Sequence, residues 1–201
     1  MNRKVSVASR RDIATKVATA ILDFIGDVPN TATEPSSTPD AAARSVASAA
    51  AAKAAAAAGT LALPVGPIGW LTILPELLAV WKIQARMVAD IAALYDKKAA
   101  LSREHMLYCL FKHSAAQAVR DLVARVGERL LVKRASLALL QAVARAIGVE
   151  VTQRMLSKSV ACWIPIAGAV GVGAYAYYDT SRVAVTAIEL FEKLNEQERA
   201  Q

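Results

Sequence analysis

The chain has 201 residues, which is enough for one domain with a substantial core. Hydrophobic residues make up 55% of it but aromatic residues only 5%, so the apolar content is mainly Ala, Val and Leu, a composition that favours helices. The formal net charge is +7, and residues 102–158 contribute ten basic and four acidic side chains. Two cysteines 53 positions apart exclude a disulfide framework and favour reduced thiols in a cytoplasmic compartment.

Residues 1–28 are expected to form an N-terminal amphipathic helix. The stretch SRRDIATK at residues 9–16 resembles the start of a twin-arginine export signal, but the apolar segment after it is short and contains Asp23 and Asp27. Helical spacing places four apolar residues on one side, namely Ile13, Val17, Ile21 and Ile25. We therefore interpret this segment as part of the folded protein rather than as a targeting signal.

A helical hairpin is expected to follow a flexible linker. Residues 29–38 are rich in Pro, Ser and Thr, which is typical of a mobile linker. Thr38 can cap a helix that begins near Pro39 and continues through an Ala-rich arm, and the Pro and Gly residues of 64–69 end that arm. In the second arm, apolar residues recur in steps of three and four at Leu71, Leu74, Leu78, Trp81, Ala85, Val88, Ala92 and Tyr95.

The remaining sequence also predicts helices only. Ser102 can cap a helix that reaches Gly127 or beyond, and a further helix is expected to stop at Gly148. A short helix, a Pro/Gly-interrupted apolar run, a final helix and a polar tail at 195–201 come after it. No segment shows sustained alternation with a period of two, so we predict an all-α single helical bundle with Ala/Gly-rich hairpins.

Two windows without charged residues are candidates for segments that enter a membrane. Residues 54–75 and 159–178 approach the length of about 20 residues that spans a bilayer, although Pro and Gly interrupt both. They fit buried core helices, a shallow hairpin in one leaflet, or true membrane spans, and the sequence leaves these three interpretations open. In the second window, Ala167, Gly171 and Tyr175 are expected to form one face for close helix packing.

The sequence in and around these two windows resembles that of a known protein family. The first block is AAAAAGTLALPVGPIGW followed by ILPELLAVWKIQARMVADIAALYDK, and the second is IPIAGAVGVGAYAYYDTSRVAVTAIELF. Both blocks resemble those of the bacterial EcsC family, over roughly residues 41–192, which makes 39–194 an EcsC-like helical domain. The resemblance implies a helical protein of uncharacterised role that associates with the membrane, and it brings no catalytic residues with it.

The sequence lacks the motifs that would name a reaction. It contains no G-x-S-x-G, H-E-x-x-H or Walker A pattern, and no cofactor is expected. Arg125, Arg129 and Lys133 form an i, i+4 stripe beside Arg134, but no aromatic platform accompanies it, so nucleic acid is not an expected partner. Anionic lipid head groups suit the same basic stripe, and the expected partner is a membrane lipid or a membrane protein.

One group of residues could still bind a metal or take part in catalysis. His105, Cys109 and His113 recur at i, i+4 and i+8, so that a helix would place them in one row. The row rises by about 12 Å, so the two imidazoles cannot easily share an ion, and no spacing in the sequence supplies the missing ligands of a zinc site. We interpret the row as a contact face turned toward solvent, another helix or a partner.

Two classes of function therefore remain open. The first is a non-enzymatic, membrane-associated helical protein, located in the cytoplasm or at the inner membrane. The second is a soluble helical bundle with a metal-binding, ligand-binding or enzymatic role centred on the His105, Cys109 and His113 face. The sequence does not determine the oligomeric state.

Overall fold

In a computed structural model of the chain, the described residues are 7–61, 69–113, 141–149 and 165–199, and over these ranges the prediction of an all-α fold is confirmed. The helices are α1 (Val7–Gly26), α2 (Pro39–Leu61), α3 (Gly69–Leu94), α4 (Arg103–Phe111), the helical segment 141–149, and α7 (Pro165–Arg199).

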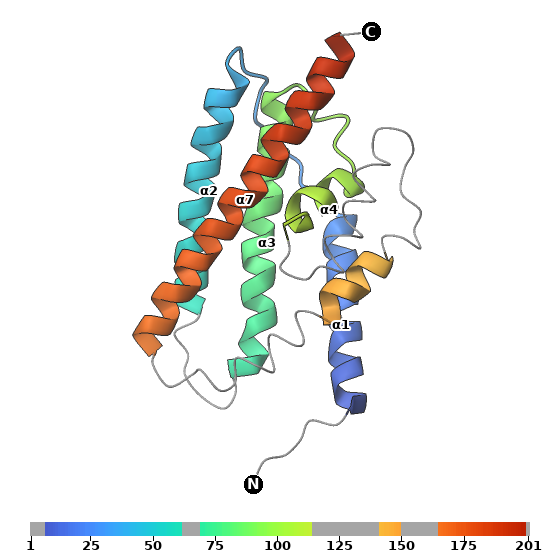
Figure 1. Cartoon of the computed structure of the whole chain (residues 1–201), viewed down its shortest axis with the longest axis vertical. Helices are drawn as coiled ribbons and strands as arrows, with labels where there is room; N and C mark the ends of the chain where they lie inside the picture. The colour runs from blue at the N-terminus through green and yellow to red at the C-terminus, as the bar shows by residue number, and fades with distance from the viewer. Residues whose placement is uncertain (1–6, 62–68, 114–140, 150–164, 200–201) are drawn as a thin grey trace.

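Helices α2 and α3 form the predicted antiparallel hairpin, and α7 runs diagonally across both of them (Figure 1). The start of α2 follows the sequence signals, because the carbonyl of Thr38 accepts the first helical bond from the Ala42 N–H at 3.2 Å. Asp40 lies in the first turn, where the helix dipole favours a negative charge, and its carboxylate pairs with Arg44.

The contact between α2 and α7 depends on small side chains. A Cβ atom added to Gly173 would lie 3.0 Å from the carbonyl oxygen of Ala55, so the two backbones come close together here. Next to this point, a small apolar cluster joins α2, α3 and α7 through Ala54, Ala58, Val80 and Ala176. The Ala-rich arm predicted from the sequence is therefore a packing surface for a second helix.

The close-packing face predicted for α7 lies on a different side of the helix from the face that packs in the structure. A Cβ atom at Gly171 would meet nothing within 4 Å, and Tyr175 is 54% exposed. The packed face instead contains Gly173, Ala176 and Thr180, which share one side of α7. Small residues occur on more than one side of this helix, so the sequence pattern alone did not determine which side approaches α2.

Helix α3 lies at the centre of the core. Its apolar seam is buried at Trp81, Ala85, Val88, Ala92 and Tyr95, and Leu78 is partly buried. At its C-terminal end, the Lys97 N–H bonds to the Ala92 carbonyl and the Asp96 N–H bonds to the Ala93 carbonyl. Asp96 has a φ of 58°, and this left-handed residue closes a Schellman motif that ends the helix.

A second layer covers α3 on the side of α1 and α4. The Trp81 ring lies 5.4 Å from Phe111 of α4 in an edge-on arrangement and 6.3 Å from Phe24 of α1. Val17 and Ile21 are buried, as the amphipathic pattern of α1 predicts. Helix 141–149 packs against α1, where a Cβ atom on Gly148 would lie 2.5 Å from the Ala14 carbonyl oxygen. Gly148 is therefore a close crossing point between this helix and α1, and residue 150, next to the predicted helix stop, lies outside the described residues.

The segment between α1 and α2 is non-helical, as expected, and it makes hydrogen bonds to α3 and to the turn after it. The hydroxyls of Thr31 and Thr33 both donate to Asp90 of α3, and the Lys98 ammonium donates to the Thr31 carbonyl. The Ser36 N–H bonds to the Leu94 carbonyl at 3.1 Å. The mobility predicted from the Pro, Ser and Thr content stays a prediction, and the Thr31 and Thr33 hydroxyls bond the segment to α3.

Two predicted boundaries need correction. Helix α4 ends at Phe111 rather than near Gly127, because the next two residues form a turn in which Lys112 pairs with Glu189 of α7 and His113 meets Asp179. At the other boundary, α7 continues to Arg199, well into the predicted polar tail. The carboxylate of Glu198 in this last part pairs with the buried Lys97, which gives the tail a reason to remain helical.

Candidate functional site

The His105, Cys109 and His113 row lies in the interior rather than on the surface. Seven of the nine residues of α4 are buried, and Cys109 has no exposed surface. Of the three orientations that the sequence left open, toward solvent, another helix or a partner, the structure shows the row packed among other helices. Because α4 is short and is covered on several sides, its apolar stripe does not mark its only buried side.

Cys109 is placed as a core residue. Burial raises the pKa of its thiol far above the usual range. Since the thiolate is the form that attacks electrophiles and binds metals, this thiol is unsuited to either task.

His105 has a structural role at the start of α4. The Ser102 hydroxyl accepts a hydrogen bond from the His105 N–H at 3.3 Å, and His105 Nδ1 accepts one from the Ser102 N–H at 3.2 Å. This reciprocal pair is a capping box with an imidazole in the place usually taken by Glu or Gln. The ring packs 6.2 Å from Phe191 of α7, and burial lowers the pKa of His105.

His113 belongs to a polar cluster between α3, α4 and α7. Its Nε2 atom lies 3.3 Å from Asp179 Oδ1, within ion-pair distance but without hydrogen-bond alignment. The Gln84 amide donates to Asp179 Oδ2 at 2.8 Å and to the Thr180 hydroxyl at 3.2 Å. Gln84 is completely buried, and its Oε1 atom has no partner among the described residues. This contact joins the turn after α4 to α7.

The structure separates the three residues that the sequence grouped together. His105 caps a helix, Cys109 fills the core, and His113 contacts Asp179. Within the described ranges, no group of three or more His, Cys, Asp or Glu side chains is arranged to hold a metal ion. The basic residues singled out in the sequence, Arg125, Arg129, Lys133 and Arg134, lie outside the described residues.

An exposed apolar stripe on α7 was not anticipated from the sequence. Among the described side chains, five of the six large exposed hydrophobic residues belong to this helix, namely Val170, Tyr175, Tyr177, Tyr178 and Val185. Val170 is 68% exposed and Tyr178 is 62% exposed. Asp179, the carboxylate in this part of the helix, contacts His113 and Gln84, while Arg182 is exposed. The stripe therefore combines tyrosine rings, valines and one cation.

The two charge-free windows can be compared with this arrangement. None of the described helices is both long and apolar enough to cross a membrane. The described part of the window 159–178 forms the first half of α7, where Gly173 and Ala176 are buried while the tyrosines are exposed. Most of the turn expected within the window 54–75 lies outside the described residues.

Comparisons with protein-family models, with curated proteins and with solved structures find no match for the chain.

Proposed function

We propose that this protein is a non-enzymatic helical protein that binds the surface of an anionic membrane, and that the stripe on α7 makes the contact. The observation that carries this proposal is the group of exposed tyrosines and valines at 170–185. Large exposed apolar side chains gathered on one helix are typical of an interaction site, and tyrosine rings favour the interface between water and lipid.

The charges around the stripe fit an anionic surface. Arg182 is exposed beside the tyrosines, whereas the partly exposed carboxylate of Asp179 contacts His113 and Gln84. Each basic residue near an anionic leaflet contributes about 1 kcal/mol of attraction. The sequence spacing of Arg125, Arg129 and Lys133 would add to this attraction, and the resemblance to the EcsC family favours a membrane location as well.

The surroundings of Cys109 and His105 favour the non-enzymatic alternative over a reaction centred on their row. The thiol is buried with a raised pKa, and the imidazole is occupied in a helix cap. Both roles are those of structural residues, so the proposal assigns neither residue to catalysis.

Flotation with lipid vesicles tests the proposal. We expect the full chain to float with vesicles of phosphatidylcholine and phosphatidylglycerol, and less with phosphatidylcholine alone. The double variant Tyr177→Ser, Tyr178→Ser should bind roughly tenfold or more weakly, because each large apolar side chain removed from water contributes about 1.5–3 kcal/mol when fully buried.

The matched control is Val149→Ser, which removes an exposed apolar residue of helix 141–149. This variant should float like the wild-type chain. If the wild-type chain stayed with the aqueous phase in both kinds of vesicle, or if the tyrosine variant floated as well as the wild-type chain, the proposal would be wrong.

A further inference from the structure

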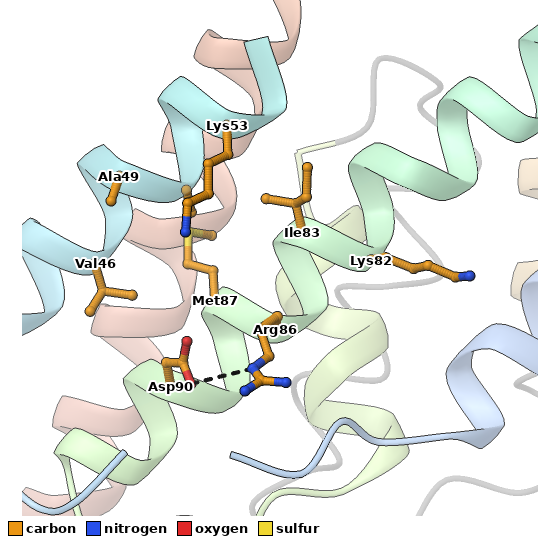
Figure 2. A pocket seen from close by; sticks show the side chains of 9 residues that line it. Val46, Ala49, Lys53, Lys82, Ile83, Arg86, Met87 and Asp90 are labelled. Atoms are coloured by element: carbon orange, nitrogen blue, oxygen red, sulfur yellow. Dashed lines mark ion pairs between the residues drawn. The ribbon is translucent and has the colours of Figure 1, made fainter. Parts of the chain in front are cut away.

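A groove lies between α2 and α3, on the side of these two helices that faces away from α7 (Figure 2). Its volume is about 450 Å³, within the range of roughly 300–1,000 Å³ that is usual for small-molecule sites. The apolar part of its lining consists of Val46, Ala49, Ala50, Ile83 and Met87. Met87 is almost completely buried at the base of the groove, and its flexible thioether can adapt to an apolar ligand.

Two cations border this apolar lining. Lys53 reaches over the groove from α2, and Arg86 borders it from α3, whereas Lys82 points away (Figure 2). No carboxylate within the described part of the chain pairs with Lys53. The groove therefore presents an unneutralised ammonium and a guanidinium next to an apolar floor.

The carboxylate at this site is already engaged. Asp90 Oδ1 accepts hydrogen bonds from the hydroxyls of Thr31 and Thr33. The Arg86 Nε atom is 3.9 Å from the same oxygen, which is a loose contact, and the Arg86 side chain is 61% exposed. The guanidinium thus keeps donors available for a second anion, and its planar fork matches the geometry of a carboxylate.

We infer that this groove binds one medium-chain fatty acid, with the carboxylate between Lys53 and Arg86 and the alkyl chain on the apolar floor. Lys53 and Arg86 at the rim favour an anion, and the apolar floor favours an alkyl chain attached to it. The volume suits one alkyl chain. The methylene groups of the Lys53 side chain can cover part of the ligand while the ammonium meets its charge. This site is separate from the tyrosine stripe on α7 and does not depend on the proposed membrane function.

Calorimetric titration of the full chain tests the inference with three probes and without vesicles. Dodecanoate, below its micelle concentration, supplies both the charge and the chain. Dodecyltrimethylammonium has the same chain with the opposite charge, and acetate has the charge without the chain. We expect saturable binding of dodecanoate and at least tenfold weaker binding of the other two.

Two groove variants separate the contributions of charge and space. Lys53→Gln combined with Arg86→Gln should weaken dodecanoate binding at least tenfold. Ala49→Trp should abolish it, because Ala49 is an exposed residue of the lining and the indole would fill the groove. The matched controls are Lys193→Gln on α7 and Ser48→Trp on a neighbouring exposed position of α2, and both should bind like the wild-type chain.

Each result of these titrations either supports or overturns the proposed fatty-acid site. Equal binding of dodecyltrimethylammonium, or unchanged dodecanoate binding by Ala49→Trp with an unaltered circular dichroism spectrum and melting curve, would overturn it, as would no binding by the wild-type chain. All these variants keep Tyr177 and Tyr178. Failure of vesicle flotation would therefore overturn only the membrane proposal, and failure of this titration would overturn only the fatty-acid site.

Discussion

The imidazole of His105 replaces a carboxylate or amide in the capping box of α4, and this gives the helix start a dependence on pH. Nδ1 can accept the hydrogen bond from the Ser102 N–H only while the ring is neutral. Burial lowers the pKa of His105 from its ordinary value of 6.5. The unfolded chain therefore takes up this proton at a higher pH than the folded chain does.

For this residue we predict that the free energy of unfolding decreases as the pH falls below 6.5, until the folded-state pKa is reached. Each unit of pKa difference corresponds to about 1.4 kcal/mol. The variant His105→Gln keeps an acceptor for the Ser102 N–H but does not titrate, so it should lose less stability over this pH range. Urea unfolding above and below pH 6.5 measures both proteins, and parallel pH profiles would contradict the prediction.

The residues of the His and Cys row also show what spacing can and cannot predict. The i, i+4, i+8 pattern correctly placed His105 and Cys109 on one helix. It could not predict that Phe191 and Asp179, more than sixty positions away in the chain, would cover His105 and meet His113. Burial of a residue depends on such distant segments, and local periodicity contains no information about them.

Among the helices, the glycines of α7 and of helix 141–149 differ in what surrounds them. A Cβ atom on Gly148 would lie 2.5 Å from the Ala14 carbonyl oxygen, which is backbone and cannot move aside easily. A Cβ atom on Gly171 would meet nothing within 4 Å. The same substitution should therefore have opposite effects at these two positions.

We predict that Gly148→Ala destabilises the protein by about 1–3 kcal/mol, the usual cost of overpacking. Gly171→Ala should be neutral or stabilise it by up to about 1 kcal/mol, because alanine is the better helix former. Thermal unfolding of the two variants beside the wild-type chain measures both effects. A loss of stability in Gly171→Ala equal to that in Gly148→Ala would show that the packing around α7 differs from that described.

The positions of the first helices follow from signals that are local in the sequence. Thr38, Pro39 and Asp40 marked the start of α2, and Ser102 marked the start of α4, because caps and dipole effects act within one helical turn. The end of α4 was missed because Lys112 and His113 make their contacts with α7. The exposed stripe at 170–185 was missed for a similar reason, since which side of α7 packs depends on how α2 and α7 meet.

At the scale of the whole molecule, the segment at 29–38 connects the N-terminal helix to the hairpin through Asp90. This carboxylate accepts the hydroxyl protons of Thr31 and Thr33, and Thr31 is itself buried. Hydrogen bonds to a charged acceptor contribute about 1.5–3 kcal/mol when both groups are shielded from water. The free energy of local opening of the segment should therefore depend on Asp90.

We predict that Asp90→Ala increases the rate of amide hydrogen exchange in residues 29–38 by about tenfold or more while leaving α2 protected. Mass spectrometry of peptides from this region measures the rate. The control is Arg44→Ala, which removes an exposed ion pair with Asp40 and should leave the exchange unchanged. Rapid exchange of the segment in the wild-type chain would mean that it behaves as the mobile linker that its composition suggests.

The close approach of α2 and α7 also has a thermodynamic consequence. Alanine and glycine have no side-chain rotamers to lose on folding, so the contact between Ala55 and Gly173 forms without side-chain entropy loss. For the same reason it has no alternative rotamers with which to adapt when the helices shift. We expect α2 and α7 to move as one rigid unit, so that displacements of the exposed tyrosines are transmitted to the hairpin rather than absorbed between the helices.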